Sequence, residues 1–186
     1  LHLCHHNLET IETTSTTSDT LLAEVCMAAK YEGNSIKTHY TKYEIQYPSS
    51  GSGFTLCTML ARSFADIGDI VRGKDPFYGN TQEKEKREDL EKNLKKIFKM
   101  IQGKNQSKLG ALSLDQVREY WWELNRETVW KALTCGAGES DKYFRKTCNG
   151  GEQTKGYCRC NDDKPDADRP NTDPPTYFDY VPQFLR

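Results

Sequence analysis

The sequence predicts a mostly α-helical fold: a helical bundle that is tied by disulfides and carries long irregular loops. Two observations predict it. Four segments repeat their apolar residues at steps of three and four, the spacing of one helix face. Seven cysteines are dispersed along 186 residues without a Cys-x-x-Cys pair of the zinc-ribbon type, which favours disulfides formed in an oxidising compartment. The expected helices span residues 20–47, 54–73, 83–102 and 113–134, with almost no strand.

The first of these segments is predicted in two parts. Asp19 is placed to cap a helix over residues 20–32, and Gly33 is a typical residue for its end. Apolar and aromatic residues at helical spacing predict a second part over residues 36–47. The run of Ser, Gly and Pro at 48–53 then predicts a flexible break.

Residues 54–73 carry the clearest helical pattern in the chain. One face is apolar and consists of Leu56, Leu60, Phe64, Ile67 and Val71. The polar flank consists of Arg62, Asp66, Asp69 and Arg72, whose spacing lets them form ion pairs along the helix. Gly73 is a suitable C-terminal stop. We therefore interpret this segment as a core helix with a charged flank.

Two further helices follow. Residues 83–102 combine a narrow apolar stripe with lysines on the opposite side. Ser113 and Gln116 match a capping box and open the helix at 113–134, which is apolar on two neighbouring sides and must be packed on both. The helical phase of Trp121 and its neighbour Trp122 indicates a core position rather than a sugar-binding platform. We expect Phe64 and Trp121 to be buried against each other's helices.

The chain changes character after Cys135, where glycine and proline are frequent and periodicity is lost. Such a segment cannot be held by burial alone, so cysteine cross-links are the expected tether. Residues 164–175 have the composition of a linker, and 177–186 begin a new amphipathic element. With seven cysteines, at least one is free or has its partner outside this sequence.

Charge and hydropathy exclude several classes of protein. The formal net charge of −1 gives no electrostatic case for binding nucleic acid or an anionic membrane. No apolar run approaches the roughly 20 residues of a membrane span. There is no initiator Met or signal-peptide pattern, so we expect a fragment of a longer protein whose targeting and anchoring elements lie elsewhere.

An enzyme, a cofactor or a metal site is not expected. His2, Cys4, His5 and His6 cluster at the N-terminus, but four ligands within five residues of a helix cannot face one point. His39 is the only other histidine, and no Gly-x-Ser-x-Gly or phosphate-binding loop is present. Ion pairing is a better interpretation of the Asp66 and Asp69 carboxylates than acid–base catalysis.

The lysines of 83–102 are the one local feature that suggests a ligand. Four of them share a helix side, and two more extend the positive charge into the next loop: Lys92, Lys95, Lys96, Lys99, Lys104 and Lys108. A row of ammonium groups suits a sulfated glycan, with a gain from counterion release. The alternative is an ordinary solvated face balanced by the acidic residues of the same helix, and the residues alone favour it.

Five stretches carry a resemblance to a known family. Residues 61–70 (ARSFADIGDI) resemble the signature of the Duffy-binding-like domains of malaria-parasite adhesins. Residues 22–33, 120–130, 158–160 and 177–186 resemble further motifs of that family, in the same order. The chain is thus similar, nearly end to end, to the alpha class of these domains, from the variant erythrocyte membrane protein 1 family.

The resemblance implies a domain division and a disulfide framework. Residues 1–17 would be the tail of the first subdomain, 18–165 the helical second subdomain, and 166–186 a linker and the start of the third. Cys4 would pair outside this sequence, and Cys57 would pair with Cys148. The remaining cysteines would form two more bridges, with Cys158 and Cys160 joined to Cys26 and Cys135 in an order that stays open.

The resemblance also implies adhesion without enzymatic activity or cofactor. The parent protein would be anchored in the infected erythrocyte membrane and would expose this part outside the cell, next to its other domains. Its partners would be host erythrocyte or endothelial receptors, including heparan sulfate, blood-group sugars and red-cell surface proteins, with rosetting in some variants. The competing class is a secreted, disulfide-stapled helical signalling protein, which would have an even number of cysteines.

Overall fold

The computed structural model describes residues 17–46, 55–75 and 81–186. Its helices are α1 (Ser18–Gln46), α2 (Leu56–Arg72), α3 (Thr81–Lys104), α4 (Gln106–Leu109) and α5 (Leu114–Leu133), followed by the 3-10 turns η1 (Phe178–Tyr180) and η2 (Gln183–Leu185). Within these ranges there are isolated bridges but no strands. The predicted mostly helical class is therefore confirmed. No helix in the described ranges has the length and apolar character that crossing a membrane requires.

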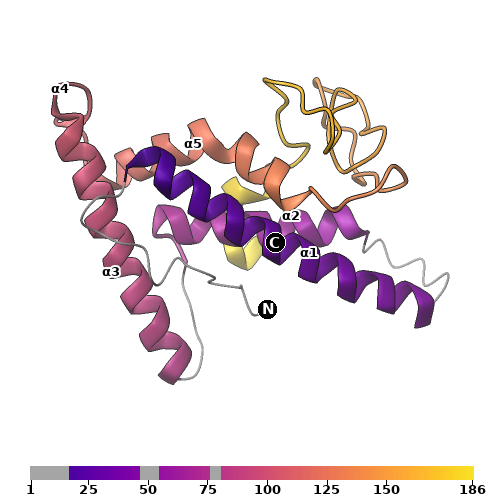
Figure 1. Cartoon of the computed structure of the whole chain (residues 1–186), viewed down its shortest axis with the longest axis horizontal. Helices are drawn as coiled ribbons and strands as arrows, with labels where there is room; N and C mark the ends of the chain where they lie inside the picture. The colour runs from indigo at the N-terminus through magenta and orange to yellow at the C-terminus, as the bar shows by residue number, and fades with distance from the viewer. Residues whose placement is uncertain (1–16, 47–54, 76–80) are drawn as a thin grey trace.

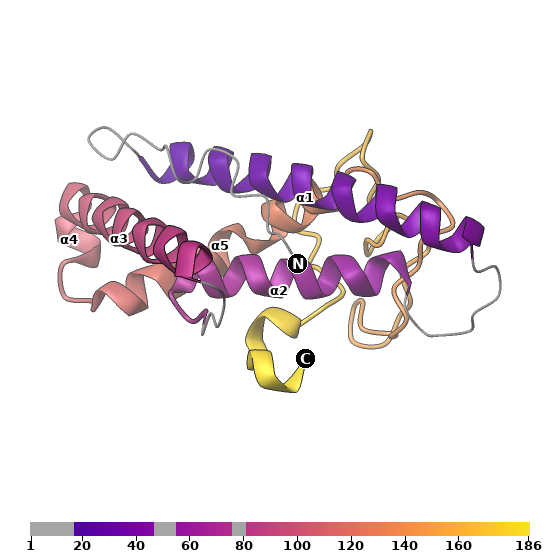
Figure 2. The same ribbon diagram turned by 90° about the horizontal axis from the view of Figure 1, so that it is seen from below.

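Three helices form the centre of the molecule. Helices α1, α2 and α5 pack on one another, while α3 lies across one end of the group (Figure 1). The irregular segment after α5 gathers at the other end, above α2 and α5. Seen from below, α2 lies between α1 and the turns η1 and η2 (Figure 2).

Helix α2 is buried on nearly every side because other elements surround it. The Thr55 hydroxyl accepts a hydrogen bond from the Thr58 amide at its start, and Gly73 ends it with a left-handed φ of 71°, as predicted. Phe64 is fully buried, and its ring centroid lies 5.1 Å from that of Trp122 and 5.2 Å from that of Trp130. The predicted packing of Phe64 on the Trp-Trp helix is confirmed.

Trp121 is buried, but on a different side from the one expected. Its ring meets Phe98 of α3 at 5.8 Å, and its indole N–H donates to the Ser18 hydroxyl at the start of α1. Consecutive helical residues point about 100° apart. Trp122 therefore faces α2, whereas Trp121 faces α1 and α3.

The helix over residues 18–46 is continuous, so the predicted end at Gly33 is wrong. A Cβ at Gly33 would lie 2.0 Å from the Leu133 carbonyl oxygen at the end of α5. The glycine thus allows two helix backbones to approach closely, and its tertiary role outweighs its low helix propensity.

This contact predicts that a glycine-to-alanine change, which normally stabilises a helix, will lower the stability of the protein at Gly33. An alanine is normally about 1 kcal/mol better than glycine inside a helix. We expect Gly33→Ala to destabilise the protein instead, because the methyl group meets backbone that cannot rotate away. Gly103→Ala in α3 is the matched control, since nothing lies within 4 Å of its Cβ position and stabilisation is expected. Urea denaturation of both variants measures the effect, and stabilisation by Gly33→Ala would refute the close approach.

Arg118 of α5 fastens α3 to the core. Its buried guanidinium donates to the carbonyl oxygens of Ile70 and Val71 at the end of α2, over 3.0 and 2.6 Å. It also donates to both carboxylate oxygens of Glu91 on α3, over 2.8 and 2.9 Å. A cation at the carbonyl end of α2 is favoured by the helix dipole. One side chain therefore fixes the positions of three helices.

Buried charges hold the C-terminal turns against α2 and α5. The Asp179 carboxylate accepts from Arg126 over 2.7 and 2.9 Å and from the Trp122 indole N–H over 2.9 Å. Arg72 donates to the Asp179 carbonyl oxygen. Because every acceptor lies on η1 and every donor on α2 or α5, the turn is fixed in one position.

The carboxylates of Asp66 and Asp69 complete this contact. Arg186 forms ion pairs with both of them, and Arg72 pairs with Asp69 at 3.2 Å. Burial raises the pKa of both carboxyls, although the neighbouring Arg186 partly offsets the rise. The predicted ion pairing on the flank of this helix is confirmed for Asp69 and Arg72.

Candidate functional site

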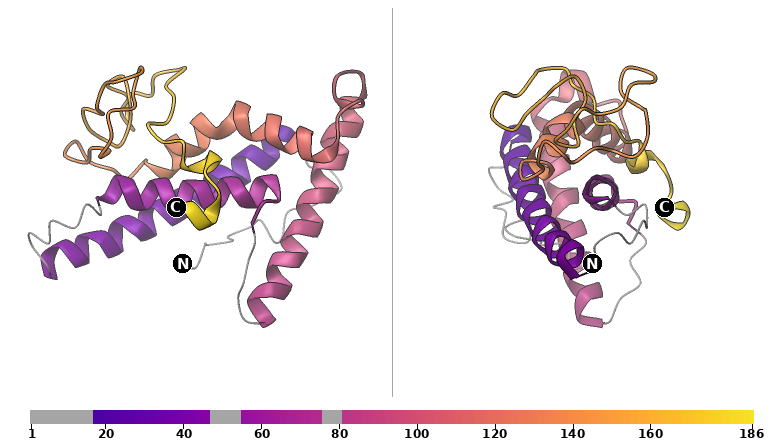
Figure 3. Two further views of the ribbon diagram at one scale, coloured as in Figure 1. Left: turned by 180° about the vertical axis from the view of Figure 1, so that it is seen from behind. Right: turned by 90° about the vertical axis from the view of Figure 1, so that its right-hand side faces the viewer.

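The predicted lysines occupy one exposed side of α3. We call Lys92, Lys95, Lys96 and Lys99 the lysine face, and all four are exposed. The opposite side buries Leu90, Leu94, Ile97 and Ile101 against the core, together with Phe98. Lys104 and Lys108 are also exposed, at the end of α3 and on α4. Figure 3 shows α3, in pink, extending away from the other helices.

The lysine face is partly neutralised by carboxylates of its own helix. Lys92 pairs with Asp89 at 3.2 Å and Lys95 with Glu91 at 3.5 Å. Glu91 is shared with the buried Arg118, so it is not fully available to Lys95. Lys96 and Lys99 have no carboxylate partner among the residues that the structure describes. Both of the interpretations of this face, an anion site and a solvated surface, are compatible with these contacts.

The disulfides differ from the expected framework. Cys57 pairs with Cys158, and Cys148 pairs with Cys160, so the expected Cys57–Cys148 bridge is wrong. The reason is a tight turn with left-handed φ values of 56° and 55° at Tyr157 and Cys158. The turn directs Cys158 toward the buried start of α2 and leaves Cys160 to meet Cys148 within the loops.

Two cysteines that were expected to form bridges are free. Cys26 on α1 and Cys135 just after α5 are half-buried thiols in the described part of the chain. Burial raises the pKa of the Cys26 thiol to about 11, which keeps it protonated and unreactive at neutral pH. These six cysteines were expected to form three bridges, but they form two. Cys4 and the N-terminal histidines lie outside the described residues, and so does the metal site considered there.

A second cluster of cations lies on the irregular segment. We call residues 142–146 the basic loop, in which Lys142, Arg145 and Lys146 are exposed. The Arg145 guanidinium lies over the Phe144 ring, 5.1 Å from its centroid. Sequence reasoning missed this cluster, because the segment has no periodicity to show which side chains face outward. The signal was present only as three cations around two aromatic residues.

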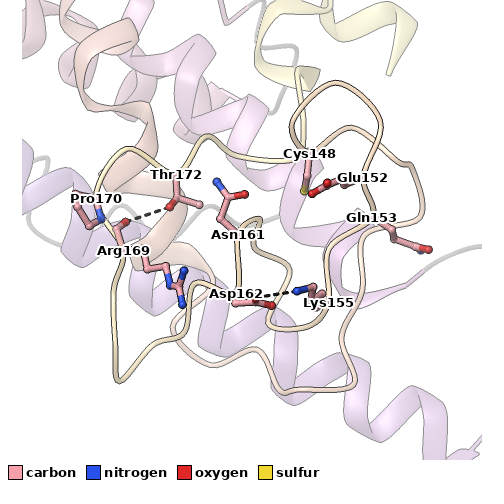
Figure 4. A pocket seen from close by; sticks show the side chains of 9 residues that line it. All are labelled: Cys148, Glu152, Gln153, Lys155, Asn161, Asp162, Arg169, Pro170 and Thr172. Atoms are coloured by element: carbon pink, nitrogen blue, oxygen red, sulfur yellow. Dashed lines mark hydrogen bonds and ion pairs between the residues drawn. The ribbon is translucent and has the colours of Figure 1, made fainter.

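A polar cavity of about 460 Å³ lies among the same loops (Figure 4). It is lined by Cys148, Glu152, Gln153, Lys155, Asn161, Asp162, Arg169, Pro170 and Thr172. Lys155 pairs with Asp162 at 2.8 Å, and Figure 4 shows Arg169 extending toward Asp162 from the other side. The walls offer two amides, one hydroxyl, two carboxylates and two cations, a set that suits a small polar molecule. No group of three possible ligands for a metal ion occurs in the described ranges.

Comparisons with known proteins show what the chain is similar to. A family model described as the Duffy binding domain matches residues 1–186. A similar solved structure is the crystal structure of the NTS-DBL1(alpha-1) domain of the Plasmodium falciparum membrane protein 1 (PfEMP1) from the varO strain. It is 37% identical, with a TM-score of 0.71, and the match covers 99% of this chain but only 40% of the solved chain. No curated protein matched the chain.

Proposed function

The chain belongs to the Duffy-binding domain family, and from this membership we infer that it is part of a cell-adhesion module that binds receptors on host cells. The family match over the whole chain is the observation that carries the proposal. The similarity to a PfEMP1 domain supports display on the surface of infected erythrocytes, on a parent protein that is anchored elsewhere. The division into 1–17, 18–165 and 166–186 remains part of this proposal.

For the receptor we propose a sulfated glycan such as heparan sulfate, bound by the lysine face of α3. Four ammonium groups on one side of a helix that rises ~1.5 Å per residue span about 10 Å, the length of one or two sugar units. Lys96 and Lys99 supply charge that is not paired with described carboxylates. Lys104 and Lys108 continue the positive surface toward α4. Blood-group sugars and red-cell or endothelial surface proteins are the other receptors that the family suggests.

Changing the four lysines of this face to glutamate should weaken retention of the full-length protein on immobilised heparin. None of the four contributes to the apolar side of α3, so the fold should persist. Each lost contact also means one fewer counterion released on binding. The slope of log affinity against log salt concentration should therefore become shallower, by about one unit for each lost contact.

The matched control makes the same change of charge elsewhere. Lys30 and Lys42 on α1, with Lys155 and Lys164 on the irregular segment, are exposed and lie on elements other than α3, and their glutamate variants should elute near the parent protein. Equal losses in the two quadruple variants would show a general charge effect. Unchanged elution of the lysine-face variant would place the glycan site on another surface.

A further inference from the structure

The basic loop carries three positive charges that no described carboxylate neutralises. Among the residues that the structure describes, no carboxylate pairs with Lys142, Arg145 or Lys146 and no hydrogen bond engages their charged groups. Other cations of the same region are neutralised: Lys155 pairs with Asp162 and Arg159 with Asp163. We propose that the basic loop is a docking site for an acidic polypeptide segment of a protein partner.

The loop is held in place by its second residue, Tyr143. Tyr143 is 1% exposed, its amide donates to the Thr154 hydroxyl over 2.8 Å, and its phenol meets the Thr176 hydroxyl at 3.1 Å. Gln153 donates to the Tyr143 carbonyl oxygen over 3.2 Å. The Cys148–Cys160 disulfide fixes the chain shortly afterwards. Since the backbone is already ordered, a partner would meet preset positions and lose less entropy on binding.

Arg145 is prepared for a carboxylate. Its guanidinium lies over the Phe144 ring, and no described residue engages its N–H groups, which can therefore donate to both oxygens of a carboxylate. Phe144 is 44% exposed and supplies an apolar contact beside the charge. Arginine and aromatic side chains placed together are the residues that most often dominate the energy of protein interfaces.

The geometry favours a polypeptide over a sugar chain. A sugar stacks on an open aromatic face, but the Arg145 guanidinium already lies over the Phe144 ring, and the Tyr143 ring lies 4.9 Å away at 59°. Lys142 and Lys146 are four residues apart, so their Cα atoms are separated by at most about 14 Å. Acidic side chains at alternate positions of an extended peptide recur every ~7 Å on one side, so two successive ones fall within that limit.

The test uses the full-length protein and three immobilised probes: a random copolymer of glutamate and tyrosine, poly-L-glutamate, and heparin. The parent protein should bind the copolymer more tightly than poly-L-glutamate, because Phe144 has an apolar partner only in the copolymer. Phe144→Ala and Arg145→Ala should each lower affinity for the copolymer about tenfold, as expected for central interface residues. Arg145→Lys keeps the charge but loses the planar fork, and should not restore binding.

Lys30→Ala on α1 is the matched control, because Lys30 is also exposed, also lacks a described carboxylate partner and belongs to neither proposed site. It should change copolymer affinity less than twofold. An equal loss in Lys30→Ala would overturn the proposal, since only net charge would then matter. A loss of heparin binding with unchanged copolymer binding in Arg145→Ala would overturn it in favour of a glycan.

Two features keep the outcome decisive. Phe144 touches the buried Tyr143, so the folding of Phe144→Ala must be checked by circular dichroism. Arg145→Gln removes an exposed guanidinium that lies over the Phe144 ring, so it should not disturb the fold. Arg145→Gln therefore decides the question if Phe144→Ala unfolds. The basic loop is tested by binding to the copolymer and the lysine face by retention on heparin, with substitutions at different residues, so failure of one proposal leaves the other intact.

Discussion

Replacing Asp179 by asparagine is expected to lower the free energy of unfolding by about 3–5 kcal/mol, the usual loss when one member of a buried ion pair is removed. The Asp179 side chain is fully buried and accepts three hydrogen bonds from Arg126 and Trp122. Asparagine has nearly the same shape but no charge. The Arg126 guanidinium would then remain buried without its counter-charge, which accounts for most of the loss.

Urea denaturation measures this effect, and Asp166→Asn is its control. Asp166 lies on the same irregular segment and is exposed, so its change to asparagine should stay within about 0.5 kcal/mol. A domain of ordinary stability, about 5–15 kcal/mol, would lose a large share of that stability in the Asp179 variant alone. Similar unfolding midpoints for the two variants would contradict the role of Asp179 in holding η1 to the helices.

Phe64→Ala should have an effect of comparable size, about 3–5 kcal/mol, because it removes a fully buried ring from the centre of the core. Phe64 meets Trp122 and Trp130 within 5.2 Å, and the Arg126 guanidinium lies 5.5 Å from the ring centroid. The cavity left behind cannot close, since Trp122 and Arg126 are themselves fixed by Asp179.

Phe184→Ala is a control of the same residue type. Phe184 is 85% exposed on η2, so its loss should alter stability by a few tenths of a kcal/mol. Thermal unfolding followed by near-ultraviolet circular dichroism reports both the stability of the protein and the packing of its tryptophans. Equal midpoints for the two phenylalanine variants would show that α2 is not the centre of the core.

Helices α2, α3 and α5 could be predicted because each has an uninterrupted apolar period, whereas α1 was predicted in two parts. The error at Gly33 arose from a local rule, since glycine commonly ends helices and nothing near it in the sequence reveals Leu133. Trp121 and Trp122 were correctly placed in the core, but the elements that each would face depended on the arrangement of α1 and α3. Periodicity thus predicts which side is buried and not which element covers it.

Spacing could not predict the disulfides or the buried charges. Cys158 and Cys160 are two residues apart, yet a left-handed turn directs them to partners in different parts of the fold. Arg126 and Asp179 are 53 residues apart and meet only once the irregular segment has folded back. The lysine face was visible because it repeats on a helix, whereas the basic loop becomes recognisable only when Tyr143 is seen to be buried.

The Cys57–Cys158 bridge also determines how the chain responds to mechanical tension. A pull applied before Cys57 and after Cys158 passes through the covalent bond, so the chain between the two cysteines, whose positions are 101 apart in the sequence, carries no load. Roughly 330–360 Å of extended chain is thereby withheld from stretching. Helices α2, α3 and α5 lie inside this loop, while α1 and the turns η1 and η2 lie outside it and are held by noncovalent contacts. Under shear, the outer elements would peel away first, and both the lysine face and the basic loop would keep their shape.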